Sequence, residues 1–127
     1  MNPVGVGIDL VDVARVERML EDKGERAMRR LLTEGERAYC QRQAAPARHV
    51  AARLAAKEAT YKALNQDGDT GYVGWHEVEV GRAEDGRPSL TLHGKARVAA
   101  ERLGVTSSLV SLTHTDTQAA AVVLLLA

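Results

Sequence analysis

Residues 46–64 read PARHVAARLAAKEATYKAL, which is the longest helical pattern in the chain. Pro46 suits the first turn of a helix, where its missing backbone donor is no loss, and the helix is expected to end near Leu64. Glu58 and Lys62 are four residues apart, so they project from one face of that helix. A carboxylate with an ammonium one turn away is part of what a site for Mg²⁺ and phosphate needs.

A second carboxylate comes from the N-terminal run Val4-Gly5-Val6-Gly7-Ile8, which predicts a strand. Asp9 directly follows this run, and a carboxylate placed there is costly to bury unless a cation meets it. Mg²⁺ typically takes one or two protein carboxylates and completes its shell with water and phosphate oxygens. Asp9 and Glu58 are therefore the candidate metal ligands, and Lys62 is the candidate phosphate contact.

Each of these residues also has an ordinary structural interpretation. Asp9 could cap the turn after its strand, although Asp12 competes for that position. Glu58 and Lys62 could form a common helical ion pair, which contributes only ~0.3 kcal/mol. Arg53 belongs to a basic stripe beside Glu58, and that stripe could meet either a phosphate or solvent.

The remaining elements follow from periodicity and turn signals on both sides of the long helix. Further helices are expected at residues 13–23, 25–32, 34–42 and 94–103, and strands at residues 4–9, 75–80, 89–92, 107–113 and 118–126. The segment 65–74, with three glycines and two aspartates, is expected to be a loop. The fold class is therefore α+β, with helices grouped in the first half and packed on a largely antiparallel sheet.

Capping signals support several of these boundaries. Asp12 is the expected N-cap of the first helix, and Gly24 is its expected end. Thr33 and Glu36 have the spacing of a capping box. Asp85-Gly86 is a hairpin signal between two expected strands.

Composition limits the classes of protein that the chain can represent. It has 127 residues, of which 45% are hydrophobic, so one domain over residues 1–127 with a small aliphatic core is expected. The charges balance at 17 of each sign, which gives no general case for nucleic-acid binding. The longest apolar run, residues 119–127, is too short to span a bilayer, and no signal peptide is evident. Cys40 is the single cysteine, which fits a reducing compartment and predicts a cytosolic protein.

His114 is a third candidate functional residue, at the end of an expected strand after Ser111-Leu112-Thr113. A histidine flanked by hydroxyls can bind a phosphate or a ribose or shuttle a proton, and it could equally be a surface residue. The chain has no glycine-rich phosphate loop and no Cys/His cluster suited to zinc. Composition and spacing alone therefore lead to a small α+β domain with a possible Mg²⁺ site.

Three motifs taken in order resemble the holo-acyl-carrier-protein synthase family, the short single-domain class of 4′-phosphopantetheinyl transferases. They are Gly7-Ile8-Asp9, Ala56-Lys57-Glu58-Ala59 with Lys62, and Ser111-x-Thr113-His114. The likeness covers nearly the whole chain, including Thr33-Glu34-Gly35-Glu36 and Gly86-Arg87-Pro88. Leu32 and Leu54 stand where aromatic residues are frequent, and Thr113 stands where serine is usual, so the functional motifs stay intact.

The resemblance implies transfer of the 4′-phosphopantetheine arm from coenzyme A to a serine of an acyl carrier protein. Adenosine 3′,5′-bisphosphate would be the other product. The resemblance implies that Asp9 and Glu58 hold Mg²⁺ and that Lys62 contacts the transferring or leaving phosphate. The serine proton would go to Glu58 or to a water on the metal, and the sequence does not choose between them.

The resemblance also implies a homotrimer with active sites at the subunit interfaces. His114, with Ser111 and Thr113 nearby, would then reach the 3′-phosphate or adenine end of coenzyme A from the neighbouring subunit. Arg53 is a second candidate contact for the nucleotide phosphates.

Two arginines are the candidate contacts for the carrier protein. Arg15 and Arg18 are three residues apart on the first expected helix, where they could dock an acidic helix. Arg26, Arg29 and Arg30 could extend that basic patch. Whether the carrier serves fatty acid or polyketide synthesis stays open.

Two other functions remain compatible with the residues. The first is a non-catalytic module that binds coenzyme A or a nucleotide, which would show binding without a Mg²⁺-dependent product. The second is another Mg²⁺-dependent phosphotransfer enzyme, against which the missing phosphate-cradling glycine loop counts.

Overall fold

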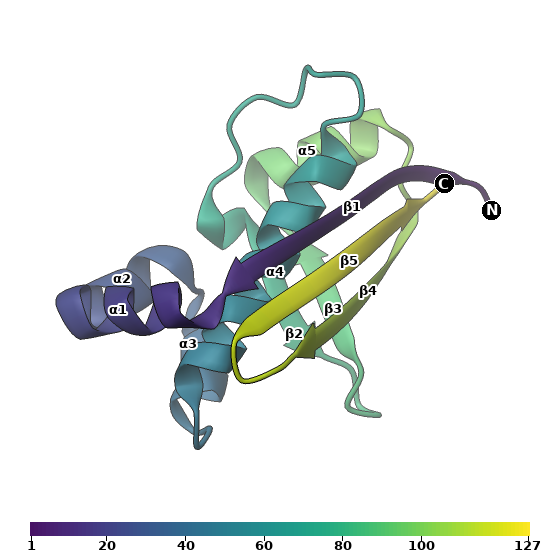
Figure 1. Cartoon of the computed structure of the whole chain (residues 1–127). Helices are drawn as coiled ribbons and strands as arrows, with labels where there is room; N and C mark the ends of the chain where they lie inside the picture. The colour runs from purple at the N-terminus through teal and green to yellow at the C-terminus, as the bar shows by residue number, and fades with distance from the viewer.

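A three-stranded antiparallel sheet brings the two ends of the chain together (Figure 1). Its strands are β1 (Pro3–Asp12), β4 (Ser107–His114) and β5 (Gln118–Leu126), in the order β1-β5-β4. The computed structural model describes all residues from 1 to 127. β1 and β5 pair along their whole length, from Pro3 opposite Leu126 to Asp12 opposite Gln118, so both termini lie at one end of the sheet.

Helix α4 (Pro46–Leu64) lies across one face of this sheet, behind β1 and β5 in Figure 1. The helix backbone approaches β1 so closely that the strand has no room for a side chain at two positions. A Cβ on Gly5 would lie 2.2 Å from the Ala63 carbonyl oxygen, and one on Gly7 would lie 1.8 Å from that of Ala59. The glycine alternation in β1 and the alanines of α4 therefore belong to one packing arrangement.

Three short helices form a second core beside the N-terminal half of α4. They are α1 (Val13–Lys23), α2 (Glu25–Leu31) and α3 (Glu34–Gln41). Gly24 ends α1 with a φ of 53°, as the sequence predicts. The predicted capping box of α3 is confirmed, because Glu36 N donates to Thr33 Oγ1 and Thr33 N donates to Glu36 Oε1. Asp12 occupies the N-cap of α1, but its side chain makes no capping hydrogen bond.

The rest of the chain forms a hairpin and one helix. The two-stranded sheet consists of β2 (Val78–Arg82) and β3 (Pro88–Leu92), and α5 (Gly94–Arg102) follows. The turn at Gly86, with a φ of 87°, confirms the predicted hairpin. The α+β class is confirmed, although the expected sheet is divided in two.

Two predicted strand boundaries are wrong. Residues Trp75–Glu77 form a 3₁₀ turn, because the Glu77 carboxylate accepts hydrogen bonds from Gly74 N at 2.5 Å and Lys95 N at 2.9 Å. The strand predicted at residue 75 therefore begins at Val78. Asp9 was expected at a strand end, but it lies within β1 opposite Ala121, because the strand continues to Asp12.

The second face of the three-stranded sheet carries uncovered apolar side chains. Val6, Ile8 and Leu10 alternate along β1 and are 58%, 66% and 66% exposed. Leu109 on β4 and Val122 on β5 are also exposed. None of the helices combines the length and apolar character needed to cross a bilayer.

Candidate functional site

Lys62 and Asp9 form the centre of the candidate site. The Lys62 ammonium nitrogen lies 3.1 Å from Asp9 Oδ1 and 3.0 Å from the Ile8 carbonyl oxygen. The Asp9 side chain is 20% exposed and that of Lys62 is 53% exposed, so the pair is reachable from solvent. The predicted helical pair of Lys62 with Glu58 is not formed, because Lys62 reaches across to β1 instead.

Glu58 lies at the same cavity as Asp9, although Lys62 does not bridge them. A cavity of about 350 Å³ is lined by both carboxylates and by the side chain of Arg15. Val16, Met19 and Trp75 are among its apolar walls. The close contact of α4 with β1 therefore brings together two carboxylates that are 49 positions apart in sequence.

The donor set suits a hard divalent cation that shares its shell with a substrate. No group of three or more His, Cys, Asp or Glu side chains is placed to hold a metal ion by itself. Two carboxylates at one open cavity leave the remaining positions of an octahedral shell to water and phosphate oxygens, which is the usual arrangement for Mg²⁺. The chemistry of Asp9 and Glu58 thus fits the predicted ion.

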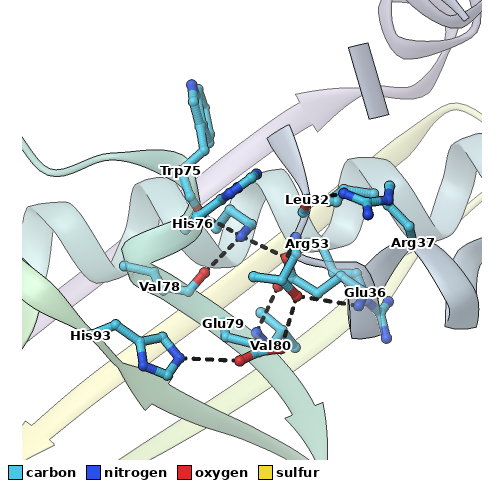
Figure 2. A network of polar contacts seen from close by, with 12 residues as sticks. Leu32, Glu36, Arg37, Arg53, Trp75, His76, Val78, Glu79, Val80 and His93 are labelled. Atoms are coloured by element: carbon cyan, nitrogen blue, oxygen red, sulfur yellow. Dashed lines mark hydrogen bonds and ion pairs between the residues drawn. The ribbon is translucent and has the colours of Figure 1, made fainter. Parts of the chain in front are cut away.

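A buried ion pair next to Glu58 was not predicted (Figure 2). The Lys57 ammonium donates to Glu36 Oε1 at 2.7 Å and to the carbonyl oxygens of Trp75 and Val78, both at 2.6 Å. Glu36 Oε2 accepts from Val80 N at 2.7 Å, so the pair joins α3, α4 and β2. Burial lowers the pKa of Lys57, while the Glu36 carboxylate opposes that shift.

This network fixes the start of β2 against the helix that carries Glu58. The capping-box spacing marks Glu36 in the sequence, but no sequence signal indicates its partner Lys57. Glu79 extends the network, since it accepts from Thr33 Oγ1 at 2.8 Å and contacts His93 Nε2 at 3.1 Å (Figure 2). The hydrogen bond from Thr33, followed by that from His93, lowers the pKa of Glu79.

A second cluster contains Arg53 and His114, neither of which lines the cavity of the two carboxylates. The Arg53 guanidinium lies 4.2 Å from the Tyr39 ring centre, and the Arg82 guanidinium lies 4.7 Å from the same centre. The rings of His49 and His114 are 5.4 Å apart, and the His49 ring is 5.7 Å from that of Tyr39. Tyr39, His49 and Arg82 are members that the sequence prediction missed.

The charges of this cluster favour an anion. Arg53 is 3% exposed, and its Nε is the one buried side-chain polar atom in the structure without a hydrogen-bond partner. Burial, followed by the charges of His114 and Arg53, lowers the pKa of His49. Both observations indicate positive potential that the chain itself leaves uncompensated.

The hydroxyls predicted to act with His114 are divided between two places. Thr113 precedes His114 at the end of β4, and both are exposed. Ser111 lines a separate groove of about 540 Å³ between β3 and β4, together with Arg87 and Leu90.

The basic patch on the first helices forms a groove of about 630 Å³. Its cationic walls are Arg15, Lys23, Arg26, Arg29 and Arg30. Leu54 and Trp75 provide apolar surface in the same groove. Arg15 therefore joins this groove to the cavity of Asp9 and Glu58, whereas Arg18 lines neither of them.

Cys40 makes no contribution to catalysis that the structure supports. The side chain is fully buried, and burial raises the pKa of its thiol to about 11. The thiol is therefore protonated near neutral pH.

Comparison with known sequences identifies close relatives. The family model of the 4′-phosphopantetheinyl transferase superfamily matches residues 5–123. The holo-acyl-carrier-protein synthase of Koribacter versatilis is 43% identical over 96% of this chain and 97% of its own. That of Alkalilimnicola ehrlichii is 46% identical over 96% of this chain and 95% of its own.

Solved structures agree with the sequence comparison. The holo-acyl-carrier-protein synthase of Neisseria meningitidis superposes with a TM-score of 0.85 at 25% identity, covering 99% of this chain and 100% of that one. The Mycobacterium tuberculosis acyl carrier protein synthase is 36% identical, with a TM-score of 0.75 and 99% coverage of both chains. The Helicobacter pylori enzyme, in complex with coenzyme A, has a TM-score of 0.79 at 26% identity, and the match covers 94% of this chain and 98% of that one.

Proposed function

This chain belongs to the 4′-phosphopantetheinyl transferase superfamily, and we propose that it transfers the 4′-phosphopantetheine arm of coenzyme A to an apo acyl carrier protein. The carrier serine oxygen forms a bond to the β-phosphorus of coenzyme A, and the bond from that phosphorus to the leaving phosphate breaks. The serine hydroxyl proton passes to Glu58 or to a water molecule, and adenosine 3′,5′-bisphosphate leaves with the bridging oxygen. The observation that carries the proposal is the meeting of Asp9, Glu58 and Arg15 at one cavity, with Lys62 paired to Asp9.

Asp9 and Glu58 would hold Mg²⁺ at that cavity. When bound, the ion supplies positive charge to the diphosphate oxygens and orients them. Lys62 neutralises Asp9 in the ligand-free chain, and its half-exposed ammonium is free to turn toward a phosphate oxygen. Lys62 thereby offsets charge that develops on the leaving group, a task that Glu58 and Asp9 alone cannot perform.

Arg53 and His114 would bind the nucleotide end of coenzyme A, with Thr113 and Ser111 on the same strand. The unpartnered Nε of Arg53 supports this assignment, because a buried donor without an acceptor suits an incoming anion. Arg53 and His114 do not line the cavity of Asp9 and Glu58, which favours a site completed by a neighbouring subunit.

We propose the homotrimer that the family resemblance implies, and the uncovered face of the three-stranded sheet supports self-association. Val6, Ile8 and Leu10 form one row on that face, and Leu109 and Val122 form the adjacent part. A large contiguous apolar patch on a globular protein usually marks an interface, and self-association would remove this one from water.

Arg15 would dock the acidic surface of the carrier protein, with Arg18 at the edge of the contact. The groove that contains Arg15 combines arginines with Leu54 and Trp75, so it offers charge at the rim and apolar surface inside. Its position next to Glu58 would deliver the carrier serine to the transfer site.

The deciding experiment incubates the protein with apo carrier protein, coenzyme A and Mg²⁺ and weighs the carrier by intact-mass spectrometry. We expect the carrier to gain the mass of one phosphopantetheine arm, and the gain to disappear with EDTA or in the Asp9→Ala variant. Coenzyme A binding without any gain on several carriers would favour the non-catalytic module. Transfer that persists in EDTA would remove Mg²⁺ from the proposal.

A further inference from the structure

Two cavities meet at Glu58 and Trp75. The first is the cavity of about 350 Å³ that contains Asp9 and Arg15. The second has a volume of about 230 Å³ and extends from the two shared residues toward the loop 65–74. Its further lining residues are Lys57, Tyr61, Tyr72, Val73, Gly74 and Val78. Apart from the two shared residues, it contains none of the proposed metal, nucleotide or carrier contacts.

The second cavity is unsuited to an anion. Lys57 is its only cationic residue, and the Lys57 ammonium is already held by Glu36 Oε1 and the carbonyl oxygens of Trp75 and Val78, all within 2.7 Å. Glu58 adds a carboxylate where the two cavities join. The remaining surface is aliphatic, aromatic and phenolic, which suits a neutral chain of alkyl and amide groups.

Transfer at phosphorus requires room for a neutral chain beside the transfer site. In an in-line displacement the attacking and leaving oxygens lie on opposite sides of the phosphorus, and the groups that stay attached lie in the plane between them. The pantetheine ester is one of those retained groups. If the carrier approaches from the Arg15 groove, the arm lies to the side of the line of attack, and the second cavity adjoins the transfer cavity at Glu58.

We propose that the second cavity receives the pantetheine arm of coenzyme A, and that Tyr61 and Tyr72 limit the size of an acyl group on its thiol. This inference rests on the proposed function, whose substrate it specifies further. The arm is uncharged and carries two amides between alkyl segments, which matches the chemistry of the lining. Trp75, whose indole points away from the Glu36 network in Figure 2, forms the wall between the arm and the carrier groove.

The two tyrosines line the cavity from different elements. Tyr61 lies on α4 three residues after Glu58, so it sits on nearly the same helical face. Tyr72 belongs to the loop after α4 and is 73% exposed, which places it at the mouth. On this proposal a free thiol ends within the cavity, whereas an added acyl chain extends toward the mouth and meets Tyr72.

The test compares donors of increasing acyl length. The rate of carrier modification is measured by intact mass with coenzyme A, acetyl-coenzyme A and hexanoyl-coenzyme A. We expect kcat/KM of the unmodified protein to fall as the acyl chain lengthens. Tyr72→Ala should raise the ratio of kcat/KM for hexanoyl-coenzyme A to kcat/KM for coenzyme A about tenfold. Tyr61→Ala should act in the same direction, while Tyr61→Phe, which keeps the ring, should leave the ratio unchanged.

Val98→Ala is the control, because Val98 is a 63% exposed apolar residue on α5 and lines neither cavity. The ratio of kcat/KM for hexanoyl-coenzyme A to kcat/KM for coenzyme A should be the same in Val98→Ala as in the unmodified protein. A length profile that is identical in Tyr61→Ala, Tyr72→Ala and Val98→Ala would overturn the proposal.

Binding is followed separately by the fluorescence of Trp75, the only tryptophan in the chain. The ratio of Kd values for hexanoyl-coenzyme A and coenzyme A should fall about tenfold in Tyr72→Ala. If no donor were turned over by any variant, the proposed transferase function would fail. The fluorescence ratio would still decide the cavity, because an unchanged ratio in Tyr72→Ala would refute the assignment.

Discussion

The ammonium of Lys62 lies 3.1 Å from the carboxylate of Asp9, although 53 positions separate the two residues in the sequence. The contact crosses from α4 to β1 at the point where the helix and strand backbones are closest. It places the Lys62 ammonium beside Asp9 at the candidate transfer site without any substrate present.

Replacing Lys62 with methionine should lower kcat by about 10²–10³-fold, because the cation that offsets charge on the leaving phosphate is lost. The apparent KM for the carrier protein should change little, since Lys62 is outside the arginine groove. Steady-state rates from intact-mass measurements give both parameters. An unchanged kcat would leave Lys62 with the structural role of pairing Asp9.

Arg15 and Arg18 should differ in their effect on carrier binding. Arg15→Gln should raise the KM for the carrier about tenfold and leave that for coenzyme A alone, because Arg15 lines both the groove and the transfer cavity. Arg18→Gln should have a smaller effect, since Arg18 lines neither. Arg97→Gln on α5 is the charge-matched control. Equal KM values for Arg15→Gln and Arg97→Gln would exclude this docking surface.

The buried pair of Lys57 and Glu36 should show strong energetic coupling. Lys57→Met leaves the Glu36 carboxylate buried without its cation, which should lower the free energy of unfolding by about 3–5 kcal/mol. The double variant Lys57→Met with Glu36→Gln removes that charge and should recover part of the loss, because the amide still accepts from Val80 N. Urea unfolding measures both values. A double variant that is less stable than Lys57→Met would contradict this account.

Gly7 should tolerate no side chain. The Cβ of alanine would lie 1.8 Å from the Ala59 carbonyl oxygen, so α4 must move away from β1, at an expected loss of about 1–3 kcal/mol of stability or more. Gly81→Ala is the matched control, because its nearest neighbour would be the Ser89 hydroxyl at 3.5 Å. Activity should fall with stability in Gly7→Ala, since the same movement separates Asp9 from Glu58. If Gly7→Ala and Gly81→Ala had the same midpoint temperature of thermal unfolding, the packing argument would be refuted.

His49 should titrate below its ordinary pKa of 6.5, because burial and the neighbouring charges of His114 and Arg53 disfavour its protonation. Below pH 6.5 the unfolded chain therefore binds this proton more readily than the folded chain, so the His49 contribution to stability falls as the pH falls through the folded pKa. A bound nucleotide phosphate adds negative charge and should raise the pKa of His49. An NMR titration with and without adenosine 3′,5′-bisphosphate tests this, and an unmoved His49 pKa would place the anion elsewhere.

The secondary structure near the ends of the elements could be predicted because local chemistry determines it. Thr33 and Glu36 satisfy each other's backbone donors within one turn, and Gly24 adopts a positive φ that few other residues accept. The alternating polarity of residues 75–80 predicts a strand that includes Trp75. The observed 3₁₀ turn is closed by Glu77 N donating to the Gly74 carbonyl oxygen at 3.0 Å, and the Glu77 carboxylate also accepts from Lys95 N, which lies 18 positions away.

The sequence alone predicts the α+β class, the long helix and the residue types expected of a Mg²⁺–phosphate site. It also carried the family resemblance that the sequence and structure comparisons confirm. Only the tertiary structure paired Lys62 with Asp9 instead of Glu58, paired Lys57 with Glu36, and gathered Tyr39 and His49 around Arg53. These contacts join residues from different elements, and their distances depend on how closely α4 approaches β1 and α3. Glycine and alanine permit that approach, but which side chains meet is decided by packing across the whole chain.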